Sequence, residues 1–295
     1  MFRVRRLLAP FVLCIALLFS EAQAFTIAWL SDTQNYHNAY KPIFDGMTQW
    51  IADNRAALDI RFVFHTGDVV GSWSSEDQWR QARESMGILS SASIPFLAAC
   101  GNHDIGYRMN YANFLKYVLS LRPASMSQEY GDTGSRYELF SANGRDYIFM
   151  GIAFSNKGPS EDEVNWINGV LRQYSSRDAI IITHSYLKKS ASYTTQGKAI
   201  FEKIVKANPN VFLVLCGHCR DISEKSVPLD DDGDGNPDRT VYAILSNFQG
   251  SKAGGGGYMR ILDFRDSDIY IYTYSPYYDS CEYPKGKTEA TVPLP

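Results

Sequence analysis

The sequence predicts an α/β fold, with one domain of packed sheets flanked by helices. Short apolar runs typical of strands alternate with amphipathic helical patterns up to residue 215. From Thr240 onward only strand patterns follow, so the domain is expected to end in a mostly β region. No linker rich in Pro and Ser and no internal repeat divides the 295 residues, which favours a single domain.

The first half of the chain alternates between strands and helices. Strands are expected where apolar residues run without a break, and helices where they recur every three or four positions. The clearest helical face consists of Ile43, Phe44, Met47, Trp50 and Ile51. In order, the expected elements are a strand at 25–30, a helix at 42–56, a strand at 60–64, a helix at 76–89, a strand at 95–99 and a helix at 111–119.

The second half begins with strands at 137–140 and 147–153, which the turn dipeptide Asn143-Gly144 joins as a hairpin. The next elements are a helix at 161–174, a strand at 179–182, a helix at 196–207 and a strand at 211–215. The last expected strands lie at 241–245, 258–264 and 269–274. Residues 284–295 are expected to form a loose C-terminal tail.

Residues 1–24 have the three parts of a secretory signal peptide. Three arginines precede an apolar run at 7–19, and Ala22-Gln23-Ala24 is a small-residue cleavage pattern. The apolar run is short for a membrane span, although an uncleaved N-terminal anchor is the alternative. We therefore expect a secreted or periplasmic protein, without a membrane span after cleavage, whose domain occupies residues 25–283.

The net charge limits which partners the chain is expected to have, and the cysteines limit its redox chemistry. The formal net charge of −3 becomes −5 without the leader, so the chain shows no clear footprint for nucleic acid. An oligomeric state is not predicted. In an oxidising compartment the four cysteines of the mature chain could form one or two disulfides, with the pairing left open: Cys100, Cys216, Cys219 and Cys281.

Polar residues with metal-binding chemistry follow five of the expected strands. They are Asp32 and Gln34 after the first strand, Asp68 after the second, Asn102, His103 and Asp104 after the third, His184 after the fourth and His218 after the fifth. In open α/β sheets, ligands gather at the carboxyl ends of strands. Carboxylate, amide and imidazole groups together suit Mn, Fe or Zn, so the sequence predicts a site for one or two divalent ions per chain.

These motifs resemble those of the calcineurin-like metallophosphoesterases, whose pattern is D-x-H, G-D, G-N-H-[DE], H and G-H-x-H. The opening Ser31-Asp32-Thr33-Gln34 also resembles that of a secreted branch of the family. The resemblance covers essentially the whole mature chain. It implies a four-layer α/β/β/α sandwich around two mixed sheets, and the hydrolysis of phosphomonoester or phosphodiester bonds in a small phosphorylated substrate by a metal-bound hydroxide.

The resemblance also implies a role for each matching residue. Asp68 matches the carboxylate that bridges both ions, and Asp32 matches a ligand of the first ion. The residues that match ligands of the second ion are Asn102, His184 and His218. His103 matches the residue that contacts the phosphate and assists the leaving group, and Asp104 matches its orienting partner.

Two positions depart from the family pattern, which has histidine where Gln34 and Arg220 stand. Gln34 still offers a carbonyl oxygen, but the guanidinium of Arg220 has no acceptor and cannot ligate a cation. Three alternatives remain: a one-metal site, Arg220 as a substrate-binding phosphate clamp alongside Asn102, or a weakly active or non-catalytic phosphate-binding protein.

Two further motifs suggest other chemistry. Cys216-Gly217-His218-Cys219 has the spacing of a thiol-disulfide exchange motif, which makes a redox protein a minor alternative. Asp230, Asp232, Asp234 and Asp238 are spaced like the start of a calcium loop, although Val241 stands where an EF-hand has glutamate. The competing interpretation of this segment is a solvated hairpin loop.

Overall fold

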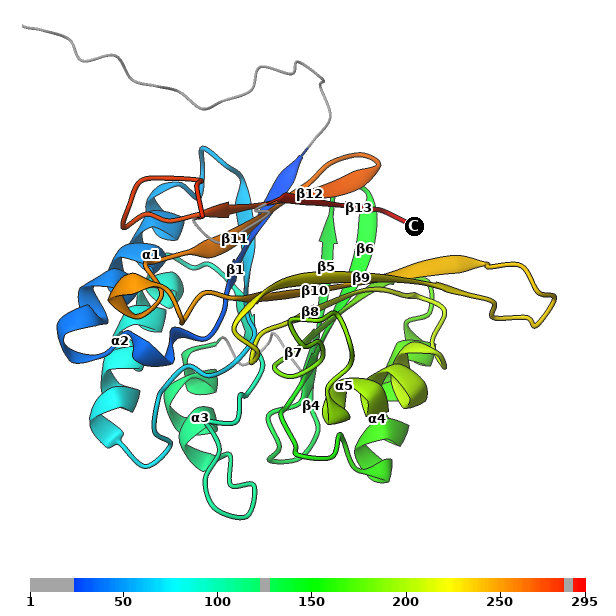
Figure 1. Cartoon of the computed structure of the whole chain (residues 1–295), viewed down its shortest axis with the longest axis horizontal. Coiled ribbons are helices and arrows are strands. Elements are labelled where there is room, and N and C mark those ends of the chain that lie inside the picture. The colour runs from blue at the N-terminus through cyan, green and yellow to red at the C-terminus, as the bar shows by residue number, and fades with distance from the viewer. Residues whose placement is uncertain (1–23, 123–127, 284–288) are drawn as a thin grey trace, which may run out of the picture.

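Two mixed β-sheets pack face to face in the computed structural model, which describes residues 24–122, 128–283 and 289–295 (Figure 1). The six strands of the first sheet are, in spatial order, β13 (Glu289–Pro293), β12 (Asp268–Tyr274), β11 (Met259–Phe264), β1 (Phe25–Leu30), β2 (Ile60–His65) and β3 (Phe96–Ala98). In the second sheet the order is β4 (Gln128–Glu129), β5 (Arg136–Ala142), β6 (Arg145–Ile152), β7 (Asp178–Thr183), β8 (Val211–Cys216), β10 (Arg239–Asn247) and β9 (Asp221–Leu229).

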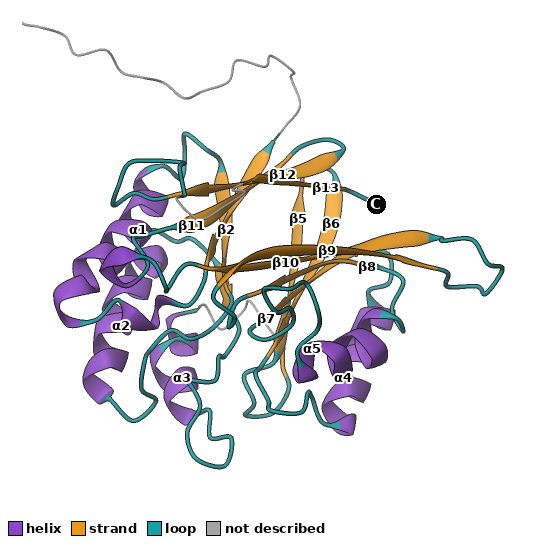
Figure 2. Cartoon of the chain, viewed as in Figure 1, coloured by secondary structure: helices purple, strands orange, loops and turns teal. Residues whose placement is uncertain are grey.

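Helices cover the outer face of each sheet, and Figure 2 shows them as two separate groups. On the first sheet lie α1 (Lys41–Asp53), α2 (Glu76–Ser91) and α3 (Ala112–Tyr117). On the second lie α4 (Glu161–Gln173) and α5 (Thr195–Ile200), which continues into a π-helical turn at Phe201–Val205. Short 3-10 helices occur at Thr33–Asn35, Asn38–Tyr40, Leu119–Leu121 and Lys252–Gly254. The expected four-layer α/β/β/α sandwich is therefore confirmed.

Local sequence explains where the long helices begin. α2 starts after Ser75, whose side chain accepts a hydrogen bond from the Gln78 amide, and α4 starts after Ser160, which caps Glu163 in the same way. Acidic residues fill the first turn of both helices, where they interact favourably with the positive end of the helix dipole.

An aromatic core fills the space between the sheets. Phe62 and Phe64 of β2 both contact Phe149 of β6, with ring centroids 5.0 and 4.9 Å apart in edge-on geometry. Phe25 of β1 contacts Phe140 across the same interface. Because β1, β2 and β3 run parallel to one another, and β6, β7, β8 and β10 do likewise, each sheet brings several carboxyl ends to one edge. This arrangement positions the candidate site.

The structure corrects the sequence predictions at two sheet edges. Strand β9 is absent from the predictions, because its alternating exposed positions and Pro228 have the character of a solvated loop. The loose tail predicted for 284–295 is wrong for Glu289–Pro293, which pairs antiparallel with β12 as an edge strand. The signal peptide predicted at 1–24 falls almost entirely outside the described residues. Among the described helices, none has the length and hydropathy that a membrane span requires.

Candidate metal centre

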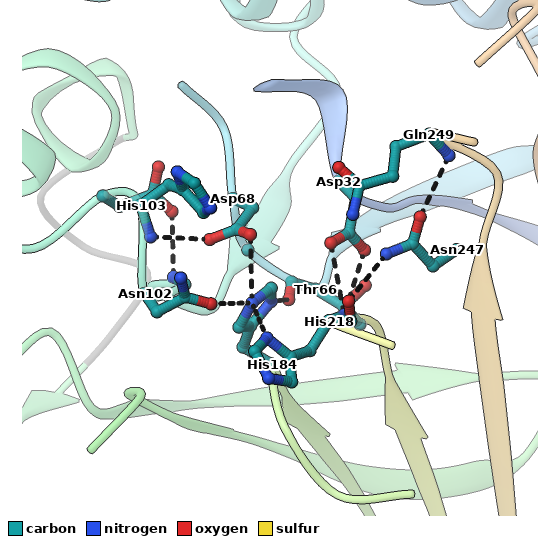
Figure 3. A network of polar contacts seen from close by, with 12 residues as sticks. Asp32, Thr66, Asp68, Asn102, His103, His184, His218, Asn247 and Gln249 are labelled. Atoms are coloured by element: carbon teal, nitrogen blue, oxygen red, sulfur yellow. Dashed lines mark hydrogen bonds and ion pairs between the residues drawn. The ribbon is translucent and has the colours of Figure 1, made fainter. Parts of the chain in front are cut away.

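Five strand ends deliver the predicted ligands to one place between the two sheets (Figure 3). β1 leads into Asp32, β2 into Asp68 and β3 into Asn102, while β7 and β8 of the other sheet lead into His184 and His218. Asp32, Asp68 and His218 have positive φ angles of 49°, 54° and 68°. The chain therefore turns sharply at these three residues and directs their side chains or amides into the shared space.

The Nε2 atom of His184 lies at the centre of this group. It is 3.0 Å from Oδ1 of Asn102, 3.2 Å from Oδ2 of Asp68 and 3.2 Å from Nδ1 of His218. Ligand atoms of Asp68, His184 and His218 all lie within 4.8 Å of one another, and the first two residues are buried. The structure thus brings together all four residues predicted to hold the second ion.

The chemistry of these four groups fits a cation. Nδ1 of His184 lies 2.9 Å from the carbonyl oxygen of Thr66, to which it must donate its hydrogen. Nε2 can then carry at most one further hydrogen, yet it faces an amide oxygen, a carboxylate oxygen and another ring nitrogen. One hydrogen cannot serve both oxygens well, whereas a divalent ion accepts electron pairs from both oxygens and from the ring nitrogens.

Electrostatics favour positive charge at the same point. Burial opposes ionisation of the carboxyl group of Asp68, but His184 outweighs it and holds the pKa of Asp68 below its ordinary value. Although burial disfavours a charged ring, Asp68 raises the pKa of His184 to about 9. Burial and the neighbouring His184 lower the pKa of His218 to about 4, which leaves that ring neutral and able to bind a cation.

The predicted first metal site is less complete. Both carboxylate oxygens of Asp32 accept the His218 amide at 3.2 Å, and Ser31 donates to Oδ2. Burial raises the pKa of Asp32 to about 7. Gln34 is buried, and among the described residues its Oε1 atom has no hydrogen-bond donor. An unpaired buried amide oxygen suits a cation ligand, so Asp32 and Gln34 fit a weak ion site beside Asp68.

Arg220 lies on the rim of the site. It follows His218 by two residues and is exposed. No hydrogen bond or ion pair to the described residues holds it. The side chain is therefore accessible to a ligand, as a phosphate clamp requires.

Two glycines let the metal-site loops approach each other. A Cβ atom at Gly101 would overlap the backbone and carboxylate of Asp68, and a Cβ atom at Gly217 would overlap the carboxylate of Asp32. Any side chain at either position would push apart the strand ends that carry the ligands. Both glycines belong to the motifs that predicted the site.

The prediction that Asp104 orients the ring of His103 is wrong. Nδ1 of His103 donates instead to the carbonyl oxygen of Gly71, 2.9 Å away. Asp104 turns back into the protein, where Oδ1 accepts the amides of Val69 and Val70 at 2.8 and 3.0 Å and Oδ2 accepts that of Gly101 at 2.9 Å. It therefore ties the two loops together rather than contacting the catalytic candidate.

Several residues that sequence reasoning missed position the ligands. The Thr66 carbonyl orients His184, and the side chain of Asn247 donates to the carbonyl oxygen of His218 at 3.1 Å. The amide of His103 donates to Oδ1 of Asp68 at 2.8 Å. Like the ligands, Asn247 lies at the end of a strand, so the rule that polar residues at strand ends mark the site could have identified it. A backbone carbonyl, by contrast, carries no signal in the sequence.

His65 supports the site without facing the ion. Its Nδ1 accepts the Gly67 amide at 3.1 Å, so its Nε2 carries the hydrogen and donates it to the hydroxyl of Thr33 at 3.0 Å. Burial lowers the pKa of His65 to about 3, which keeps the ring neutral. His65 therefore acts on the site by hydrogen bonding.

The cysteine motif lacks the properties of a redox centre. Cys216 and Cys219 are not joined by a disulfide. Cys216 is fully buried at the end of β8, and burial raises its pKa to about 12. Burial also raises the pKa of the Cys219 thiol. Both shifts disfavour the thiolate that disulfide exchange requires.

The acidic loop of residues 230–238 lies at the tip of the long β9–β10 hairpin, away from the helices (Figure 1). Carboxylate oxygens of Asp230, Asp232 and Asp238 lie within 4.8 Å of one another, and all three residues are exposed. Asp234 instead accepts the amide of Asn236 at 2.7 Å. Calcium binding stays a prediction for this loop.

The sequence matches one known protein family and one curated protein. The sequence model of the calcineurin-like phosphoesterases matches residues 25–219. The curated protein YvnB of Bacillus subtilis (strain 168), described as uncharacterized, is 41% identical over 259 residues, which cover 86% of this chain. The aligned region is 20% of YvnB, so the chain spans about one fifth of the length of this relative.

Solved structures with much lower identity share the fold. A dimetal phosphatase from Danio rerio is 12% identical with a TM-score of 0.60, over 91% of this chain and 98% of that one. GAP50, the anchor in the inner membrane complex of Plasmodium, is 13% identical with a TM-score of 0.59, over 92% and 89%. Purple acid phosphatase PPD1 from yellow lupin seeds is 13% identical with a TM-score of 0.59, over 92% and 54%.

Proposed function

The chain belongs to the calcineurin-like phosphoesterase family, and we propose that it is a metal-dependent hydrolase of phosphate esters. One observation carries the proposal: Asp68, Asn102 and His218 all face Nε2 of His184 within 3.2 Å. The similarity of the fold to that of a dimetal phosphatase supports the proposal. These four residues would hold one ion, while Asp32 and Gln34, with Asp68 as the shared ligand, would hold a second.

The donor set favours Mn, Fe or Zn, because imidazole and carboxylate ligands bind all three. When bound, such ions polarise a phosphoryl oxygen and lower the pKa of a bound water. The protein supplies orientation: Thr66 fixes the ring of His184, Asn247 fixes the His218 backbone, and Gly101 and Gly217 allow the loops to close around the ions.

His103 is proposed to act on the leaving group. Its amide is tied to Asp68, which places the residue beside the metal ligands, and its ring is exposed. Because Nδ1 donates to the Gly71 carbonyl, Nε2 is the ring atom left for a substrate, and in the doubly protonated ring it would transfer its proton to the departing oxygen. The exposed guanidinium of Arg220 would bind phosphate oxygens that do not react, together with the amide of Asn102.

Export completes the proposal. The arginines, apolar run and small-residue cleavage pattern of residues 1–24 support secretion or a periplasmic location. The opening Ser31-Asp32-Thr33-Gln34 supports membership of the secreted branch of the family. Separation of the mature chain from whole cells, with mass spectrometry of its N-terminus, tests this point. A mature N-terminus at Phe25 in the exported fraction is expected, and an intact cytosolic chain would contradict it.

A non-catalytic phosphate-binding or interaction protein on the same fold is the second candidate. It is favoured by Arg220 and Gln34 at positions where the family pattern has histidine, and by the fold that the chain shares with GAP50, an anchor in the inner membrane complex of Plasmodium. The thiol-disulfide alternative has less support, because burial disfavours the thiolate of Cys216.

Hydrolysis assays separate these candidates. The mature protein would be loaded with Mn, Zn or Fe and assayed on aryl phosphomonoesters and diesters, beside Asp68→Ala and the exposed control Asp53→Ala. Metal-dependent turnover that Asp68→Ala loses and Asp53→Ala keeps is expected. A wild-type protein that binds phosphate but shows no metal-dependent turnover would support the non-catalytic candidate.

A further inference from the structure

A half-exposed tryptophan lies on the loop that orients His103. Gly71, whose carbonyl oxygen accepts Nδ1 of His103 at 2.9 Å, precedes Trp73 by two residues. The indole of Trp73 is 41% exposed, although the residue is among the largest apolar ones in the chain. The same loop, between β2 and α2, carries Asp68, so it links a metal ligand, the His103 ring and this indole.

The Trp73 loop is tied down on both sides. The carbonyl oxygen of Trp73 accepts Nε1 of Trp79 at 2.7 Å and Nδ2 of Asn113 at 2.9 Å. The amides of Gly71 and Ser72 both donate to Oε1 of Gln78 at 2.9 Å. These hydrogen bonds join the backbone of the loop to α2 and α3, so the position from which the indole projects is fixed before any ligand arrives.

A second loop, between β3 and α3, packs against the indole of Trp73. A Cβ atom at Gly106 would lie 2.9 Å from Cε3 and 3.1 Å from Cζ3 of Trp73, so the bare glycine packs against the ring. Tyr107 follows directly and is 83% exposed. The turn that presents it is closed by the Gly106 amide donating to the Asn110 carbonyl at 2.7 Å. This loop, between β3 and α3, also carries His103, as the Trp73 loop carries Asp68.

We propose that Trp73 and Tyr107 form a binding site for the leaving group of the substrate, and that this group carries a planar aromatic or heteroaromatic ring. The inference rests on the proposed function, since it takes His103 to mark the side from which the alcohol departs. Isolated exposed aromatic residues are common on protein surfaces. Here Gly106, the neighbour of Tyr107 in the chain, packs against the Trp73 ring, and hydrogen bonds hold the Trp73 backbone. Both aromatic residues lie on loops that carry site residues.

The chemistry indicates phosphate esters of nucleosides or of similar ring-bearing alcohols. A base that stacks on an indole or phenol gains affinity through its π-face, with little dependence on its identity. The bond that breaks is the ordinary ester bond between phosphorus and the alcohol oxygen. The aromatic site would therefore change substrate preference without adding a step to the reaction.

Two substrates with the same leaving oxygen test this site. Adenosine 5′-phosphate and ribose 5-phosphate both release a primary alcohol and differ by the adenine ring. Stacking of one base contributes roughly fivefold to a hundredfold in affinity, so we expect the wild type to favour the nucleotide in kcat/KM by at least about fivefold. Trp73→Ala should bring this ratio near one, Tyr107→Ala should reduce it, and Trp73→Phe should retain most of it.

The control is Leu139→Ala, which removes an apolar side chain of similar exposure, 42%, from β5. It should leave the ratio at the wild-type value. A wild-type ratio near one, or a ratio that Trp73→Ala does not change, would overturn the inference. Circular dichroism of each variant would confirm that it folds.

Calorimetric binding of the same two ligands to the metal-loaded protein separates this inference from the proposed function. If neither ester is hydrolysed, the proposed function fails. Tighter binding of the nucleotide, lost in Trp73→Ala and kept in Trp73→Phe, would still support the aromatic site. Equal binding of both ligands to the wild type would contradict it.

Discussion

The ring of His103 is oriented by Gly71, whose carbonyl oxygen lies 2.9 Å from Nδ1, and not by a carboxylate. A carbonyl oxygen can only accept, so Nδ1 keeps its hydrogen and Nε2 is the atom available to a substrate. The orientation thus depends on the position of the loop at 71–73, which Gln78 holds through two backbone amides. A side chain is not needed for this task.

Replacing Asp104 should mainly change stability. Its carboxylate accepts three buried backbone amides, so Asp104→Ala leaves three donors unpaired and should lower the free energy of unfolding by about 2–5 kcal/mol. Urea unfolding of the metal-free protein measures this loss. A variant as stable as the wild type, with only a changed pH profile of hydrolysis, would contradict the assignment and would restore Asp104 as the partner of His103.

His65 should make the protein sensitive to acid. Burial lowers its pKa from 6.5 to about 3, so the folded state binds its proton less readily than the unfolded chain. The stability that this neutral ring allows is present above about pH 6.5 and is lost as the pH falls toward 3. Relative to His65→Gln, the wild type should lose stability in urea between pH 7 and pH 4. Parallel curves for the two proteins would refute this.

Asn247 should tune metal affinity without being a ligand. Its amide group holds the carbonyl oxygen of His218 at 3.1 Å and is itself held by the Gln249 amide at 2.9 Å. Asn247→Ala should therefore weaken metal binding by roughly tenfold. Titration with zinc, monitored by calorimetry, measures the change, with Asn113→Ala as the amide control. An unchanged zinc affinity would show that the His218 loop is fixed by other contacts.

Arg220 should determine how well the first ion site fills. Arg220→His places a neutral imidazole where the family pattern has one and removes a positive charge. We expect this variant to bind a second ion more tightly than the wild type does, whereas Arg220→Ala should gain less because it supplies no ligand. Elemental analysis at limiting metal separates the three proteins. Equal ion content in all three would mean that residue 220 does not reach the site.

The ligands could be predicted because their signal is local. Each ligand follows the end of an apolar strand within a few residues, and parallel strands bring such ends to one edge. These ligands are Asp32, Asp68, Asn102, His184 and His218. The direction in which a side chain points after a turn does not follow from this local signal. Asp104 adjoins His103 in sequence, but the turn closed by its amide on the Gly101 carbonyl at 3.2 Å sends its carboxylate inward. Spacing alone does not encode that choice.

The missed strands also have a physical reason. β9 and β13 lie at sheet edges, where half of the side chains face solvent and charged residues are tolerated. Their sequences therefore resemble loops, whereas the buried β7 and β8 have continuous apolar runs. The Gly71 and Thr66 carbonyls are beyond sequence reasoning for another reason, since every residue carries the same group.

Metal content of the purified mature protein tests the central claim most directly. After loading with zinc or manganese and removal of the excess, elemental analysis should find at least one ion per chain in the wild type. His184→Ala, which removes the ring at the centre of the cluster, should lose that ion, while His65→Gln should keep it. A wild-type protein that retains no metal, or a His184→Ala variant that retains as much as the wild type, would contradict the account.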